Sequence, residues 1–181
     1  MNRSIGRTMP DAPAVNGAGR TTRRRTTRAR LTVDVAVKSP LWRAEPGARA
    51  VVRRSVLEAA AAVSAEGELA VVLADDSAIR KLNRDWRGKD AATNVLSFPL
   101  PAAGAAGLLG DIVIAYETTA REAQAEGRPL RNHLAHLAVH GFLHLVGYDH
   151  ETDREADAME SLETVILSRL GVPNPYGAGE S

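Results

Sequence analysis

Apolar and polar residues follow two different periods along the chain, and the difference separates strands from helices. Over 31–37, in LTVDVAV, the two kinds alternate, which is typical of a half-buried strand. Short apolar runs bounded by turn residues predict three more strands, at 68–74, 93–98 and 108–115. The Ala- and Gly-rich stretch 101–107 between the last two is expected to be a flexible loop. The pattern therefore predicts four strands in the first two thirds of the chain.

Apolar residues three and four positions apart predict five helices between and after these strands. Pro46 and Pro129 are placed to open two of them, and Gly147 to end one. Thr152 and Glu155 have the spacing of a capping box, which starts the last helix. The expected helices span 47–65, 75–85, 117–127, 129–146 and 152–171. The order β-α-β-α-β-β-α-α-α indicates an α+β domain with one mixed sheet.

Length and composition narrow the classes of protein to consider. A chain of 181 residues is long enough for one domain with a proper core, which we expect over 31–181. There is no cysteine, so disulfides, thiolate metal sites and thiol nucleophiles are all excluded. No apolar run approaches the ~18 residues of a membrane span, and no secretory signal is recognisable. A transition metal would therefore be held by imidazole, carboxylate or water.

The first thirty residues differ from the rest of the chain. Residues 1–30 contain eight arginines and one acid, so the remaining 151 residues carry a net negative charge. With almost nothing to bury, this stretch is predicted to be a disordered basic tail. Its arginines suit phosphate binding. A mitochondrial transit peptide, an overlong start and a solvated tail without a dedicated role are the alternatives.

Three histidines near the C-terminal end of the fourth expected helix, 129–146, and in the turn that follows it point to a metal site. His140 and His144 are four residues apart, so their rings project from one helix face. Gly147 tolerates positive φ, which lets the chain turn back and bring His150 opposite the pair. Three imidazoles with one open position are a layout of catalytic zinc sites. A lone histidine on an apolar helix is usually a packing residue, but this triple spacing favours one metal ion.

The remaining histidines and one glycine refine this hypothesis. His136 is expected to be a packing residue, with a role behind the site or against substrate as the alternative, and His133 is expected on the surface. The spacing H-x-x-x-H-x-x-G-x-x-H is that of metzincin proteases, in which a glutamate follows the first histidine as general base. Here that residue is Gly141, which cannot take a proton. Peptide hydrolysis by that mechanism is therefore not expected.

Three segments together resemble the YbeY family of bacterial and organellar endoribonucleases and rRNA-maturation factors. They are LNRDWRGKDAATNVLSFP (82–99), LLGDIVIA (108–115) and HLAVHGFLHLVGYDH (136–150). The resemblance covers roughly Leu69 to Tyr176 and leaves out the first thirty residues. It implies a zincin-like α+β fold with a small mixed sheet and a metal site on the H-x-x-x-H helix and its following turn.

The resemblance also implies roles for single residues. His140, His144 and His150 match the family's ligands for one Zn²⁺ per chain, and Arg87 matches its essential arginine. Asp111 falls in the family's LGD strand and is expected near the site, so Arg87, His140 and Asp111 are the expected catalytic residues. The implied activity is metal-dependent, single-strand-specific RNA cleavage in small-subunit rRNA 3′-end maturation and ribosome quality control. Implied partners are rRNA, the small ribosomal subunit, a ribosomal protein and an assembly GTPase, without a membrane and in the cytoplasm rather than an organelle.

The chemistry of these residue types agrees with phosphodiester cleavage. A divalent metal polarises a phosphate or activates water, the guanidinium fork of Arg87 suits phosphate oxygens, and RNA brings its own 2′-hydroxyl. The general base is left open between metal-activated water, Asp111 and Asp149. Two alternatives remain: a metallohydrolase of another substrate, and a non-catalytic, zinc-stabilised ribosome-assembly factor. A basic patch is expected beside the site, made of Arg80, Lys81, Arg84, Arg87 and Lys89.

Overall fold

A four-stranded mixed sheet forms the middle of the molecule in the computed structural model, which describes residues 31–100 and 107–177. The tail predicted for 1–30 and nearly all of the predicted loop 101–107 lie outside these residues. The strands lie in the order β1-β2-β4-β3, with β1, β2 and β4 parallel and β3 antiparallel to β4. This confirms the mixed sheet. The strands are β1 (Thr32–Val37), β2 (Glu68–Ala74), β3 (Val95–Pro99) and β4 (Leu108–Ala115).

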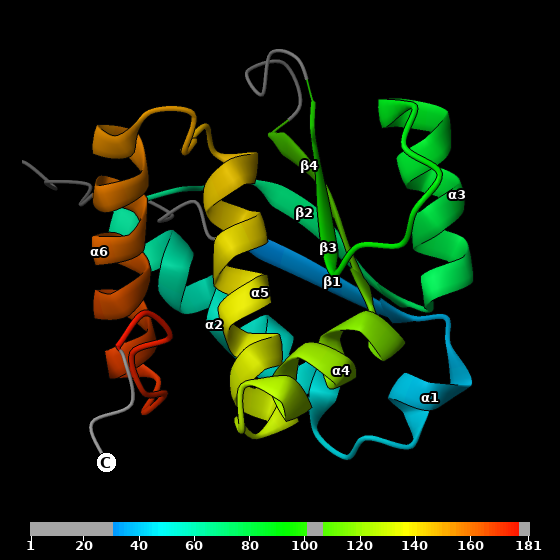
Figure 1. Ribbon diagram of the computed structural model, residues 1–181. Coiled ribbons are helices and arrows are strands. Elements are labelled where there is room, and N and C mark those ends of the chain that lie inside the picture. Colours follow the sequence, from blue (N-terminus) through cyan, green and yellow to red (C-terminus); the bar gives the residue numbers. More distant parts are fainter. Residues whose placement is uncertain (1–30, 101–106, 178–181) are drawn as a thin grey trace, which may run out of the picture.

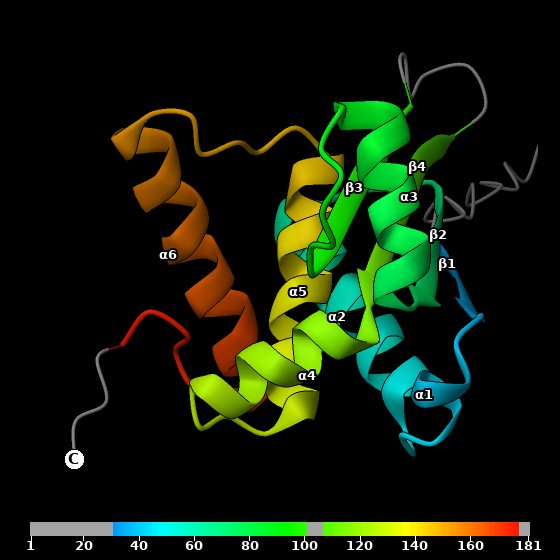
Figure 2. The ribbon, with the colours of Figure 1, turned by 45° about the vertical axis from the view of Figure 1, so that its right-hand side comes forward.

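Helices cover both faces of this sheet. Figures 1 and 2 show α3 on one face and α5 on the other, with α6 packed outside α5. The helices are α1 (Pro40–Arg43), α2 (Ala48–Val63), α3 (Asp76–Arg87), α4 (Tyr116–Ala125), α5 (Leu130–Leu145) and α6 (Asp153–Arg169). The five expected helices are confirmed, and the capping box of Thr152 and Glu155 opens α6. The short α1 was not predicted, although Ser39 caps it and Pro40 stands at its first position.

Two apolar cores result, one on each face. The larger lies between the sheet and α2, α5 and α6, where Val71 and Ile112 of the strands join Phe142 of α5. The smaller lies under α3 and contains Ile79 and Val113. Neighbouring residues of one strand point to opposite faces, which explains why Ile112 and Val113 belong to different cores. Because α5 packs into the larger core, this helix is held in place and can position side chains for a site.

Within the described ranges, no helix is long and apolar enough to cross a membrane.

Candidate metal centre

The first two histidines of the predicted site lie side by side on α5. His140 and His144 are one helical turn apart, and their Nε2 atoms face each other at 3.1 Å. Two nitrogens bound to one tetrahedral zinc ion lie about 3.3 Å apart, given Zn–N bonds of about 2.0–2.1 Å. The spacing of the two ring nitrogens therefore already suits a shared metal ion.

A glycine turn after α5 brings the third histidine to this pair. Gly147 has a φ of +96°, its N–H donates to the His144 carbonyl, and the N–H of Tyr148 donates to the Leu143 carbonyl. This Schellman arrangement ends the helix and reverses the chain, and it explains why a glycine stands at 147. The His150 ring centroid lies 5.8 Å from that of His140 and 4.9 Å from that of His144. One nitrogen from each ring lies within 4.8 Å of the other two.

The surroundings of His144 favour the form of its ring that binds metals. Burial lowers the pKa of His144, and the neighbouring His140 and His150 lower it further. A neutral imidazole presents a lone pair, whereas an imidazolium cannot coordinate. Three imidazoles without sulfur or a carboxylate suit zinc among the common divalent metals, and they suit the hard ions Mg²⁺ and Ca²⁺ poorly. The donor set therefore fits the predicted ion.

A buried carboxylate lies behind the three histidines, and it was not predicted from the sequence. Glu163 of α6 is fully buried, and its Oε1 lies 2.7 Å from Nδ1 of His140. Burial by itself raises the pKa of Glu163, but hydrogen bonds from His136, His140 and Tyr176 outweigh it and lower the pKa to about 2. The helical spacing could have indicated that Glu163 is buried, since it lies four residues after the buried Met159 and three before the buried Ile166, on one helix face.

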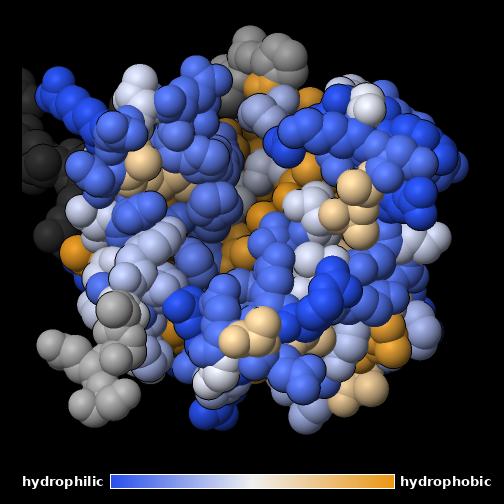
Figure 3. Space-filling model, viewed as in Figure 1, coloured by the Kyte–Doolittle hydropathy of each residue, from blue (hydrophilic) through white to orange (hydrophobic). Residues whose placement is uncertain are grey.

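The three histidines open onto a hollow of about 520 Å³. Arg87 of α3 also lines it, together with Ser97 and Pro99 of β3. Figure 3 shows this side of the molecule hollowed between α5 and α3, with hydrophilic residues along its margins. A volume of this size lies within the usual range of ligand sites. The hollow is thus the place where a substrate group would meet both the imidazoles and a guanidinium.

Arg87 reaches this hollow from the end of a helix rather than from a turn. The expectation that α3 stops near Asp85 was wrong, because the helix continues to Arg87 and ends at Gly88, whose φ is +68°. Two acids close to Arg87 in the sequence are engaged elsewhere: Asp85 with Arg84 at 3.3 Å and Asp90 with Arg80 at 2.8 Å. Among the described residues, the Arg87 guanidinium forms no ion pair. Its charge is therefore available to a ligand.

Asp111 does not join this group, which corrects the expectation that it lies near the metal ligands. It pairs with Phe98 across the sheet, one position before Ile112. Ile112 faces α5, since its Cγ2 would lie 2.9 Å from a Cβ on Gly141. Strand side chains alternate, so Asp111 points to the opposite face, towards α3. It is exposed, and it is not among the residues that line the hollow.

The two other histidines of α5 also differ from what was expected. His133 was predicted on the surface, but it is buried, and its Nε2 lies 2.8 Å from Oε2 of Glu122. His136 is not simply a packing residue, because its Nε2 lies 3.2 Å from Oε2 of Glu163. Both rings lie on the buried or half-buried side of a helix that is apolar almost all round. Because a polar group removed from water needs a hydrogen-bond partner, each ring is paired with an acid.

Close packing explains why residue 141 is a glycine, and it also explains why the glutamate of the proteases could not stand there. A Cβ at this position would lie 2.9 Å from Cγ2 of Ile112 and 3.2 Å from Cγ2 of Val95. The Ser97 hydroxyl donates to the Gly141 carbonyl at 2.8 Å, which fixes α5 against β3. A glutamate here would point between the helix and the sheet. The structure therefore leaves no room for a general base at 141.

Gly141→Ala should lower the free energy of unfolding by about 1 kcal/mol, although alanine in a helix interior is usually better than glycine by a similar amount. The β-branched side chains of Val95 and Ile112 are stiff and cannot move aside cheaply. Denaturant unfolding of the metal-loaded protein measures the change. Arg131→Ala, at an exposed position of α5, is the control and should stay within about 0.5 kcal/mol of the parent. A more stable Gly141→Ala variant would contradict the close contact.

Comparisons with known proteins agree with the resemblance carried by the three motifs. The family model for endoribonuclease YbeY matches residues 43–171. A Rhodopseudomonas palustris (strain BisA53) protein named endoribonuclease YbeY is 59% identical over 152 residues, 79% of this chain and 88% of that protein. A Bradyrhizobium sp. (strain BTAi1) protein of the same name is 53% identical over 159 residues, 82% of this chain and 94% of that protein. A solution structure of a Thermotoga maritima protein matches with a TM-score of 0.46 and 20% identity, covering 82% of this chain and 97% of that chain. Since the family match spans most of the chain and includes His140, His144, His150 and Arg87, the chain belongs to the endoribonuclease YbeY family.

Proposed function

We propose that this chain is a zinc-dependent endoribonuclease that cuts single-stranded RNA, with small-subunit rRNA 3′-end maturation and ribosome quality control as its cellular role. One observation carries the proposal. The ring nitrogens of His140, His144 and His150 converge beside a hollow, and Arg87, which forms no ion pair with any residue that the structure describes, lines the same hollow. Three histidines that can bind a metal ion and a guanidinium, all lining one hollow, suit an anionic ligand. The family's substrate class, RNA, makes that ligand a phosphodiester.

The three imidazoles would hold one zinc ion, which supplies Lewis-acid polarisation of a phosphate or an activated water when it is bound. Arg87 then binds the non-bridging oxygens through its planar fork and stabilises the charge that builds on them in the transition state. The 2′-hydroxyl of RNA is a nucleophile that the substrate itself provides. Asp149, which lines the hollow, is the remaining protein candidate for the general base once Asp111 is placed on the far face of the sheet.

The surroundings of the hollow suit a single strand. Trp86, next to Arg87, is 73% exposed and contacts Phe98 edge-on, with 5.7 Å between ring centroids. An exposed indole held in place by a second ring is a surface on which a nucleobase can stack. The predicted basic patch is exposed along α3, although Arg80 and Arg84 are paired with acids. A hollow of about 520 Å³ accommodates a short piece of splayed strand more readily than the rigid duplex.

The cellular assignments extend this proposal. Precursor rRNA in the small subunit is the proposed substrate, with a ribosomal protein and an assembly GTPase as partners, and the cytoplasm as the compartment. The alternative of a zinc-stabilised assembly factor without catalysis makes the same fold and metal predictions. It differs only in turnover, which is therefore what the first experiment must measure.

The purified, zinc-loaded protein should cleave a defined single-stranded RNA oligonucleotide with multiple turnovers. The same RNA annealed to its complement should be cut at least about tenfold more slowly, because its backbone cannot be splayed into the hollow. Denaturing gel analysis of end-labelled RNA, with RNA in excess over protein, gives both rates. A His150→Ala preparation purified in parallel controls for contaminating nuclease. Tight RNA binding without any turnover would leave the assembly factor as the better description.

A further inference from the structure

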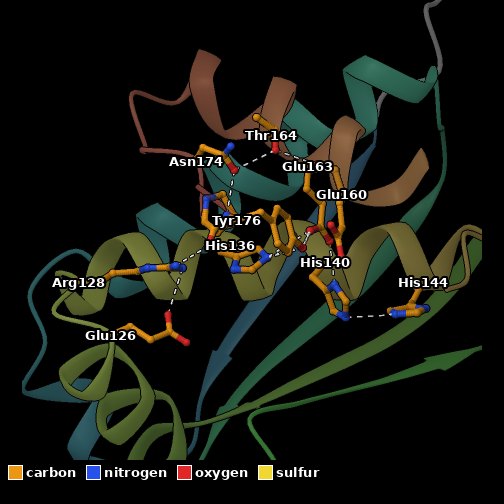
Figure 4. Close-up of polar contacts among 11 residues, drawn as sticks. Glu126, Arg128, His136, His140, His144, Glu160, Glu163, Thr164, Asn174 and Tyr176 are labelled. Atoms are coloured by element: carbon orange, nitrogen blue, oxygen red, sulfur yellow. Dashed lines mark hydrogen bonds and ion pairs between the residues drawn. The ribbon is translucent and has the colours of Figure 1, made fainter. Parts of the chain in front are cut away.

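One fully buried carboxylate links three elements behind the metal centre. Glu163 of α6 lies between His140 and His136 of α5 and Tyr176 of the segment that follows α6 (Figure 4). Its Oε1 accepts from His140 at 2.7 Å, while its Oε2 is shared by His136 and the hydroxyl of Tyr176. A carboxylate taken out of water is costly unless it is fully hydrogen-bonded, and three donors meet that need here.

The proton positions in this cluster follow from its contacts. Nδ1 of His136 is buried and, within the described part of the chain, has no hydrogen-bond partner. Nε2, the ring nitrogen that faces the carboxylate, is therefore the nitrogen that donates a proton to Glu163. Burial and the contact with Glu163 raise the pKa of Tyr176, so its hydroxyl also keeps its proton and donates.

The same reasoning fixes the tautomer of His140. With Oε1 of Glu163 as acceptor at 2.7 Å, the proton of a neutral His140 ring is held on Nδ1. Its Nε2 is then left with a lone pair, and this is the atom that faces His144 at 3.1 Å. The carboxylate thus selects the ring form of His140 that can bind a metal, and holds the ring in that direction.

The segment after α6 is attached at several points, so the position of Tyr176 is not accidental. Gly171 follows α6 with a φ of +73°, and the chain after it brings Tyr176 to His136 and Glu163 (Figure 4). Arg128 donates to the carbonyl of the buried Pro175, and the backbone N–H of Tyr176 donates to the side chain of Asn174 at 2.9 Å. Thr164 of α6 also contacts that side chain, at 3.2 Å. The family model's match ends at 171, and Tyr176 is the last residue of the stretch that resembles the family.

We propose that Glu163 is a positioning residue for the metal ligand His140, and that Tyr176 and His136 hold Glu163 in place, so that the segment after α6 is part of the metal centre. This proposal rests on the proposed metal-binding function. Glu163 touches neither substrate nor reacting atoms. It acts through His140 by fixing the tautomer and direction of the ring, and hydrogen-bonded partners of ligating histidines commonly act on metal affinity in this way.

The same residues admit a second arrangement, which the experiment must exclude. His136, His140 and Glu163 together place three potential ligand atoms within 4.8 Å of one another, as a metal site of their own would. The distances favour hydrogen bonds, since the 2.7 Å between Nδ1 of His140 and Oε1 of Glu163 leaves no space for an ion between them. One zinc ion per chain is therefore expected, with its loss on mutation of His144 or His150.

Glu163→Gln should weaken zinc binding by about 10- to 100-fold, as is typical for removal of such a partner. Tyr176→Phe, which removes one donor to Glu163 and leaves the core intact, should weaken it about fivefold, the scale of one hydrogen bond. Competition with a chromophoric chelator measures the zinc affinity, and denaturant unfolding of the metal-free proteins measures stability. Glu122→Gln is the matched control, because Glu122 pairs with His133, a histidine of α5 outside the metal centre. Its zinc affinity should equal that of the parent.

A second readout separates positioning from a general loss of structure. In the cobalt-substituted proteins, the visible absorption of the ion reports its ligand geometry, and it should change in Glu163→Gln and stay unchanged in Glu122→Gln. Parental zinc affinity in both Glu163→Gln and Tyr176→Phe would overturn the proposal, as would two zinc ions per chain. If the parent protein itself binds no zinc, the proposed function fails instead, and the two failures are distinguishable. Loss of stability in Glu163→Gln together with unchanged zinc affinity in Tyr176→Phe would also count against positioning.

Discussion

Alanine at His140, His144 or His150 should remove the zinc ion and reduce RNA cleavage by about 10³-fold or more, the scale of losing a metal's contribution to the transition state. The metal-free variants should still fold. Fully buried residues of α5 such as Phe142 and Leu143 belong to the larger core, so the helix is held by the core and not by the metal. Elemental analysis, circular dichroism and single-turnover cleavage on the same preparations measure the three quantities.

A histidine on the same helix provides the control for this result. His133→Ala removes a buried imidazole and its contact with Glu122, so it should cost about 1–3 kcal/mol of stability while zinc content and cleavage are retained. The contrast isolates the ligand role from the cost of losing any buried ring. Full zinc content in His150→Ala would remove the third ligand from the assignment, because His150 is exposed and has no packing role to obscure the result.

Arg87→Ala should slow single-turnover cleavage by about 100-fold or more while leaving zinc content and melting temperature unchanged, the scale of removing one group that stabilises developing charge. No described ion pair is broken by the substitution, and the side chain is exposed, so the fold has little to lose. Arg87→Lys should recover part of the rate, because an ammonium keeps the charge but not the fork that binds two phosphate oxygens.

Arg84→Ala is the matched control for this prediction. Arg84 lies one helical turn before Arg87 on α3, but it pairs with Asp85 and does not line the hollow. Its loss should weaken RNA affinity at most, with the single-turnover rate at saturating RNA unchanged. Near-parental cleavage by Arg87→Ala would refute its catalytic role and favour the assembly factor over the enzyme.

Most of the fold could be predicted because its elements carry local signals. The alternation of apolar and polar residues predicted β1, and the capping residues predicted the start of α6. Glycines predicted the ends of helices, as Gly147 does for α5. The expected helix 75–85 falls short of Arg87 because a polar helix end carries no apolar period, and α3 stops only where Gly88 adopts positive φ. The unpredicted α1 is a single turn, too short for any period to be visible.

The site was predictable only where its residues are neighbours in the chain. His140, His144 and His150 lie within one helix and its turn, so their spacing alone indicated that they meet. Glu163 and Tyr176 approach His140 through the packing of α6 and the chain after it, and no local pattern specifies that contact. Asp111 shows the converse: proximity was inferred from a motif, but strand alternation places its side chain on the other face of the sheet.

The three ligands differ in how firmly the protein holds them, and this determines how a metal ion can come and go. His140 and His144 are fixed by a helix packed into the core, whereas His150 lies on an exposed stretch between Gly147 and the cap of α6 at Thr152. Opening its exposed part, residues 149–151, releases one ligand while Tyr148 stays packed against the core and the other two ligands stay in place. Metal exchange therefore requires only a local, low-energy opening at the surface, and its rate should be independent of the global stability of the protein.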